Sequence, residues 1–75
     1  MEMNRKSAFL RAARAWLGEE QRAAATAAGV GWNTLLDAEK GRACTDKSWA
    51  KLADYYRSRG ISLVEDGELV FIIIR

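Results

Sequence analysis

The sequence has no histidine, no proline and a single cysteine, Cys44, among its 75 residues. Without histidine, and with one thiol that has no base or metal-ligand partner at a useful spacing, the zinc signatures are absent. The acidic residues are scattered, and Gly29-Val30-Gly31 lacks the lysine of a phosphate-binding P-loop. We therefore expect no enzymatic activity, no metal and no cofactor.

Other absences bear on the cellular setting. One cysteine cannot form an internal disulfide, and no signal peptide is visible. The longest apolar run, Leu69 to Ile74, is far too short to span a membrane. These features predict a cytoplasmic protein with no membrane partner.

The composition is that of one small globular domain. Hydrophobic residues make up 49% and charged residues 29% of the chain, which separates it from disordered proteins. The net charge of +2 is uneven, because residues 1–60 carry eleven Lys and Arg against seven Asp and Glu, whereas residues 61–75 carry one against three. A basic helical part suits a phosphate-rich partner. A solvated surface explains the same excess equally well, so charge alone does not decide the function.

Hydrophobic spacing predicts four helices in residues 1–60. The first would be capped by Asn4 or Ser7 and end at Leu17-Gly18, and the second would cover about 19–28 with Glu19 and Glu20 in its first turn. The third would cover about 31–40, and the fourth about 47–59 after a cap at Thr45 or Asp46. The expected core consists of large residues in the first and fourth helices and small or branched ones between: Phe9, Leu10, Ala13, Trp16, Leu17, Ala24, Ala28, Val30, Leu35, Ala38, Trp49, Leu52, Ala53 and Tyr56.

The last fifteen residues, 61–75, change to a strand pattern. Asp66-Gly67 between two apolar runs predicts a β-hairpin with a two-residue turn, packed with residues 1–60 into one compact unit. The second run does not alternate, so one face of the hairpin would be apolar and uncovered. A second copy of the chain is the simplest cover, and the expected dimer contacts are Leu69, Phe71, Ile72 and Ile73.

Residues Gln21 to Gly41 carry the strongest functional signal. Two short helices joined by a short turn containing glycine form a helix-turn-helix unit, whose second helix lies in the DNA major groove. Counted from Gln21, the fifth position is the small Ala25, where two helices cross closely. The ninth is Gly29, which adopts a positive φ without steric cost.

Three motifs stand in register here: the lead-in RAARAWLG-x-x-Q, the turn AAGV and the stop E-x-G. Together they resemble the lambda-repressor-like family of Cro and Xre regulators, from about Leu10 to Gly60. The resemblance implies a mainly α fold, a four-helix helix-turn-helix domain, here followed by the C-terminal β-hairpin. It also implies an ion pair of Arg14 with Glu39 that ties the first helix to the third. The hairpin departs from the family, which usually has a fifth helix or a tail there.

The resemblance implies a DNA-contacting set on and around the third helix. Trp32, Asn33 and Leu36 would reach base edges, and Gln21 would touch a base or a phosphate near it. The expected phosphate contacts are Arg22, Thr34, Lys40, Arg42 and Lys47. Alternatives remain: Trp32 could pack on a neighbouring loop, and Asp37 could accept from cytosine or point away from DNA.

These observations predict a sequence-specific regulator that binds double-stranded DNA as a homodimer on a near-palindromic operator. An autoregulatory repressor of a small operon is the simplest form, and the antitoxin of a toxin–antitoxin pair is a close variant. A protein-interaction module that kept the fold without strong DNA binding is the competing hypothesis. Gly31, Asp37 and the modest charge favour that alternative slightly.

Overall fold

The computed structural model describes residues 3–42, 44–66 and 68–73, with side chains for 5–42 and 44–62. The described chain forms four helices and one two-stranded antiparallel sheet, so the mainly α class with four helices is confirmed. Their bounds are α1 Met3–Leu17, α2 Gln21–Ala28, α3 Trp32–Glu39, α4 Asp46–Ser58, β1 Ile61–Asp66 and β2 Glu68–Ile73. The fold measures 29 × 27 × 19 Å.

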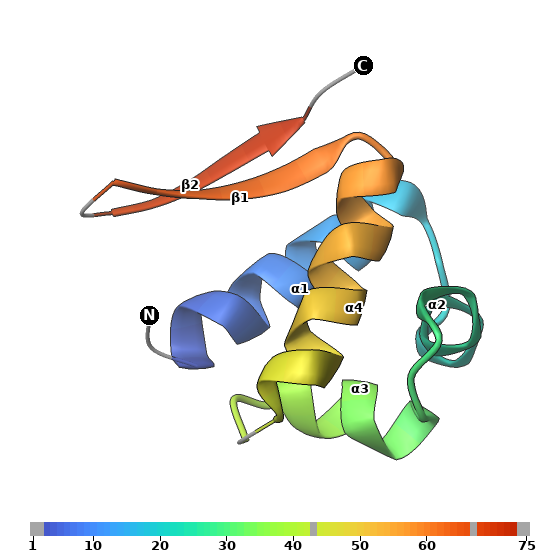
Figure 1. Ribbon diagram of the computed structural model, residues 1–75. Coiled ribbons are helices and arrows are strands. Elements are labelled where there is room, and N and C mark those ends of the chain that lie inside the picture. The colour runs from blue at the N-terminus through green and yellow to red at the C-terminus, as the bar shows by residue number, and fades with distance from the viewer. Residues whose placement is uncertain (1–2, 43, 67, 74–75) are drawn as a thin grey trace.

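The helices and the sheet occupy opposite ends of the molecule (Figure 1). Helix α3 lies at one end, α1 and α4 cross in the middle, and β1 and β2 lie at the other end. Helix α3 contacts α1 and α2, and β1 contacts α4. The described surface of α3 farthest from the sheet is therefore free of other elements.

Helix α1 begins earlier than expected. It starts at Met3, so Asn4 and Ser7 lie inside the helix and neither caps it. Ser7 is only 3% exposed, and it lies one turn before the fully buried Leu10 on the same side of the helix. Packing of this side against the core extends the helix past the predicted cap. Gly18, with φ 70°, ends the helix where the sequence predicted.

The starts of α4 and α2 have different causes. Thr45 caps α4, because its side-chain oxygen accepts from the backbone N–H of Ser48 at 3.1 Å. The prediction that Glu19 and Glu20 lie in the first turn of α2 is wrong, because α2 begins at Gln21 and both residues precede it. Tertiary contacts hold Glu19 outside the helix: its carboxylate accepts from Tyr55 and forms an ion pair with Arg59 at 3.0 Å.

The core lies between the four helices, and Ala24 and Ala25 of α2 are as fully buried as the large residues of α1 and α4. Phe9 is 1% exposed and meets the rings of Trp49 and Tyr56 edge-on, each at 6.1 Å between ring centroids. The other buried hydrophobic residues are Leu10, Ala13, Ala24, Ala25, Leu35, Ala38, Leu52, Tyr56 and Ile61, with Leu17, Ala28, Val30 and Trp49 partly buried against them. Most of the predicted core is therefore correct, and Ile61 joins the start of the sheet to it.

Trp16 is the clear exception. It was expected in the core but is 55% exposed. The buried side of α1 runs through Leu10, Ala13 and Leu17, at successive steps of three and four residues. Trp16 stands one position before Leu17 and is therefore turned by about a quarter of a turn, toward solvent.

The hairpin register also corrects the prediction. Asp66 pairs with Glu68, and Glu65 pairs with Leu69. A two-residue turn at Asp66-Gly67 would instead have paired Glu65 with Glu68. A shift of one residue moves every position of a strand to the other face of the sheet. Because β1 begins at the buried Ile61, the packing of that residue sets which positions face the helices.

Candidate nucleic-acid interface

The connection between α2 and α3 is short and made by glycines. Gly29 has φ 80°, and the N–H of Val30 bonds to the carbonyl of Ala25 at 3.0 Å, which closes the end of α2. Gly31 is extended and precedes α3 without a side-chain cap. The two helices therefore leave the turn in different directions and remain in contact.

Helix α3 has one buried and one open side. Leu35, Ala38 and Glu39 are buried against the rest of the protein. Trp32 and Asn33 are exposed at its first turn. Leu36, expected on the open side, is half-buried, as is Thr34. Of the four residues predicted to read bases, Trp32 and Asn33 are thus the exposed ones, whereas Gln21 is half-buried like Leu36.

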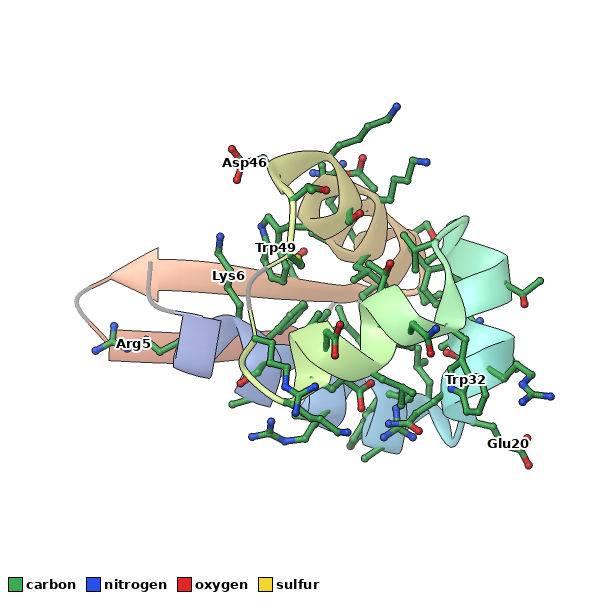
Figure 2. The ribbon with its side chains drawn as sticks, turned by 90° about the horizontal axis from the view of Figure 1, so that it is seen from below. Arg5, Lys6, Glu20, Trp32, Asp46 and Trp49 are labelled. Carbon is green, nitrogen blue, oxygen red and sulfur yellow. The ribbon has the colours of Figure 1, made fainter. Side chains whose placement is uncertain are left out.

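Trp32 does not stand alone on this surface. The guanidinium of Arg22, on α2, lies 4.1 Å from the centre of its ring. At an exposed site such a cation–π contact contributes about 0.5–1 kcal/mol. Figure 2, which looks onto α3, shows Trp32 beside the start of α2, with Glu20 nearby. Arg22, a predicted phosphate contact, and Trp32, a predicted base contact, therefore form one stacked pair.

Arg42 and Asp37 form a second surface pair. The guanidinium of Arg42 lies 3.2 Å from the Asp37 carboxylate, and both side chains are largely exposed. An exposed pair of this kind contributes at most about 1 kcal/mol. It offsets part of the charge of Asp37 on this surface.

The other predicted phosphate contacts border the same end of the molecule. Lys40 is exposed at the end of α3, and Lys47 is exposed in the first turn of α4. Between α3 and α4 lies a depression of about 360 Å³, lined by Thr34, Asp37, Cys44, Thr45 and Ser48. Burial raises the pKa of the Cys44 thiol, so it stays protonated and weakly nucleophilic at neutral pH.

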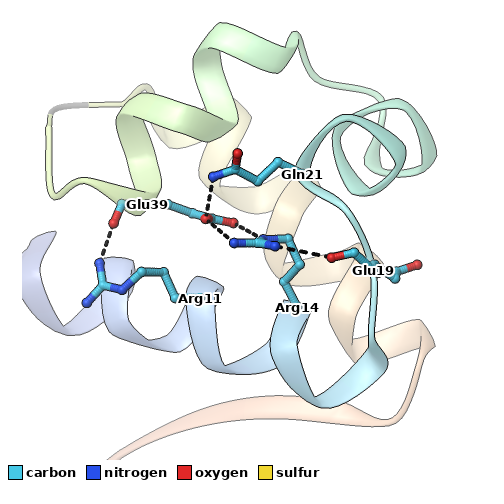
Figure 3. A network of polar contacts seen from close by, with 5 residues as sticks. All are labelled: Arg11, Arg14, Glu19, Gln21 and Glu39. Carbon is cyan, nitrogen blue, oxygen red and sulfur yellow. Dashed lines mark hydrogen bonds and ion pairs between the residues drawn. The ribbon is translucent and has the colours of Figure 1, made fainter.

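A polar network around Glu39 joins the end of α3 to α1 and to the start of α2 (Figure 3). Arg14 donates to both oxygens of the Glu39 carboxylate, from Nε at 2.7 Å and from Nη2 at 2.9 Å. Glu39 is 3% exposed, so this is a buried, forked ion pair. The hydrogen bond to Glu39 raises the pKa of Arg14, against the opposing effect of burial. The structure thus brings together the two residues that the family resemblance paired.

Sequence reasoning missed three members of this network. Arg11 donates to the backbone carbonyl of Glu39, and Arg14 donates to the carbonyl of Glu19 at 3.1 Å. Gln21 donates from Nε2 to Oε1 of Glu39 at 3.1 Å. The only signal for Arg11 was its place one helical turn before Arg14. The contact of Arg14 with the carbonyl of Glu19 depends on the turn between α1 and α2 and had no sequence signal.

The predicted dimer contacts are four residues of β2. The side chains of Leu69, Phe71, Ile72 and Ile73 lie outside the described part, and only their backbone in β2 is described. Within the described residues, no group of three acidic or cysteine side chains is arranged to hold a metal ion. No described helix is long and apolar enough to cross a membrane.

No protein-family model matches the chain, and no curated protein matches it significantly in sequence.

Proposed function

We propose that this protein is a sequence-specific regulator that binds double-stranded DNA through α3, with α2 and α3 acting as a lambda-repressor-like helix-turn-helix unit. The observation that carries the proposal is the exposed first turn of α3, bearing Trp32 and Asn33, at the end of the molecule opposite the sheet (Figure 1). In such units the N-terminal residues of the second helix contact base edges.

The charges around α3 support the proposal. Arg22, Lys40, Arg42 and Lys47 are all exposed and come from α2, the end of α3, the following loop and α4. Arg22 stacks on Trp32 at the first turn of α3, and Lys40 and Arg42 follow its last turn, so cations lie at both ends of the helix. This spread suits the two phosphate backbones that flank a major groove. The buried side of α3, with Leu35, Ala38 and Glu39, fixes the helix to the rest of the domain.

Asn33→Ala is expected to reduce specific binding by roughly 1–3 kcal/mol and to relax the preference at one base pair, because an asparagine amide can both donate to and accept from adenine. The measurement is a gel-shift titration on the DNA upstream of the protein's own gene and on single-base variants of the bound site. Arg42→Ala is the control: it should weaken all sequences alike and lower the salt slope by about one. Unchanged operator affinity of Asn33→Ala would show that this residue does not read a base.

We further propose a homodimer formed along the free edge of β2. In the described chain β2 pairs with β1 alone. The two strands lie side by side when viewed from α3, so one face of the sheet is turned toward the helices and the other away (Figure 2). Stacking two outer faces would leave the two α3 helices pointing in opposite directions. Edge-to-edge pairing keeps both on one side, as two half-sites about 34 Å apart require.

The register selects the variant that tests the dimer. Ile72 pairs with Ser62, and position 73 pairs with the buried Ile61. Successive positions of a strand lie on opposite faces, so positions 62 and 72 are on the face opposite Ile61. Ile72→Asp should give monomers and weaken operator binding on the order of 100-fold, since the second half-site no longer adds its affinity. Ser62→Asp places the same charge on the same face but on the strand away from the free edge, and should stay dimeric. A dimeric Ile72→Asp protein with normal binding would exclude this interface.

One observation favours the competing function. Trp16 is 55% exposed on α1, and Ala12 and Ala15 beside it are exposed as well. Large exposed aromatic residues are enriched where proteins bind one another. A protein-interaction module, including an antitoxin, would use this surface without DNA. The gel shift separates the two, because such a module would show no salt-dependent, sequence-selective binding.

A further inference from the structure

Helix α4 contacts both ends of α2 through one of its faces. Lys51, Tyr55 and Arg59, the last at the C-terminal cap, follow one another at steps of four residues, which places them on the same side of the helix. Tyr55 and Arg59 contact Glu19, two residues before α2, and Lys51 lies 3.4 Å from the carbonyl oxygen of Gly29, directly after α2. The Lys51 contact is long and exposed, so the contacts at the start of α2 are the stronger ones.

The contacts at the start of α2 form a closed ring of hydrogen bonds. The Tyr55 hydroxyl donates to the carboxylate of Glu19 and accepts from Nη1 of Arg59 at 2.8 Å. The same nitrogen of Arg59 lies 3.0 Å from the Glu19 carboxylate, and the Glu19 side chain is only 17% exposed. The backbone carbonyl of Glu19 accepts from Arg14 at 3.1 Å. Glu19 is thus held by α1 and α4 together.

The β-hairpin leaves from the same end of α4. Gly60, with φ 90°, follows Arg59, and its N–H donates to the carbonyl of Arg57 at 3.0 Å. The next residue, Ile61, begins β1 and is fully buried. Figure 1 shows the connection between α1 and α2 beside the last turn of α4, close to the point where β1 begins. The hairpin and the start of α2 are therefore both attached to the end of α4.

In the proposed dimer this attachment determines where the two α3 helices lie. The hairpins join the protomers, so the position of α2 and α3 relative to the end of α4 sets the distance and the angle between the two α3 helices. Moving two half-sites apart by one base pair shifts them by about 3.4 Å and turns them by about 35° around the DNA axis. A firmly attached α2 fits one spacing, whereas an α2 that can shift against α4 fits several.

We propose that Tyr55 and Arg59 are positioning residues that determine which half-site spacing the dimer accepts, by holding Glu19 at the start of α2 against the end of α4. Both residues lie near the sheet, at the end of α4 away from α3, so they act without touching DNA (Figure 1). The proposal rests on the proposed DNA-binding function and on the proposed homodimer.

The test uses the full chain and half-sites that the wild-type protein selects from random DNA. The half-sites are joined at the selected spacing and at spacings one and two base pairs shorter and longer, and one half-site is also measured alone. Binding is titrated for wild type, for Tyr55→Phe and for the double variant Tyr55→Phe with Arg59→Ala. Arg57→Ala is the matched control, because it removes the same charge from the same helix but pairs with Asp54 of α4 itself. Light scattering and urea melts establish the oligomeric state and the folding of each variant.

Wild type should bind the selected spacing on the order of 100-fold more tightly than spacings changed by two base pairs, since the second half-site then no longer adds its affinity. The double variant should lower this preference about tenfold, because its α2 can shift to engage the second half-site at more than one spacing. It should bind the single half-site as tightly as Arg57→Ala does. Tyr55→Phe removes two hydrogen bonds without a change of charge and should fall between, and it decides the matter if the double variant does not fold.

Three results would overturn the proposal while DNA binding and the dimer stand. They are an unchanged spacing preference, an equal loss of preference in Arg57→Ala, and single half-site binding weaker than that of Arg57→Ala, which would show that the residues act within one protomer. A wild type that selects no sequence would refute the proposed function, and a monomeric wild type would refute the dimer. This assignment fails with either.

Discussion

Arg14→Ala should lower the free energy of unfolding by about 3 kcal/mol, because it leaves the Glu39 carboxylate buried without its charge partner. Glu39 is 3% exposed and loses both hydrogen bonds that Arg14 donates to its carboxylate. The remaining neighbours cannot replace the charge either. Gln21 is neutral, and Arg11 donates to the backbone carbonyl of Glu39 instead of its carboxylate.

Urea melts of wild type and variants measure this effect. Arg14→Lys is the matched control, since it keeps the charge but loses the fork, and it should fall between wild type and Arg14→Ala. The double variant Arg14→Met with Glu39→Leu should recover much of the loss, because it removes both charges together. Identical urea midpoints for Arg14→Ala and wild type would contradict a buried ion pair.

Phe9→Ala should cost about 3–5 kcal/mol, the range for removing a large buried aromatic side chain. Phe9 is 1% exposed, and its ring meets both Trp49 and Tyr56 at 6.1 Å. The substitution opens a cavity where α1 and α4 meet and removes two edge-on ring contacts. A protein of this size has little stability to spare, so thermal melts should show a large drop or an unfolded chain.

Trp16→Ala is the control, because it removes a larger aromatic side chain from the same helix. Trp16 is 55% exposed, so its loss should cost under about 1 kcal/mol. The difference between the two variants tests the placement of the buried side of α1. Equal destabilisation by both would contradict the exposed position of Trp16 on α1.

Helix existence followed from local features of the sequence. Apolar residues three and four apart predicted α1 to α4, and Gly18 and Thr45 stand at boundaries where the structure places them. Predictions that depended on more distant contacts failed in part. The start of α1, the exposure of Trp16 and the hairpin register all depend on how elements pack, and periodicity within one element does not contain that information.

The sequence by itself determined the helix count, most of the core and the segment proposed to bind DNA. Only the tertiary structure decided how the polar side chains on that segment are used. Gln21 is oriented by Glu39, eighteen residues away, Arg22 stacks on Trp32, and Arg42 holds Asp37. The physical reason is the distance along the chain over which each interaction acts. Helix and turn preferences act over a few neighbouring residues, whereas the direction of an amide or a guanidinium depends on charges that only folding brings within about 4 Å.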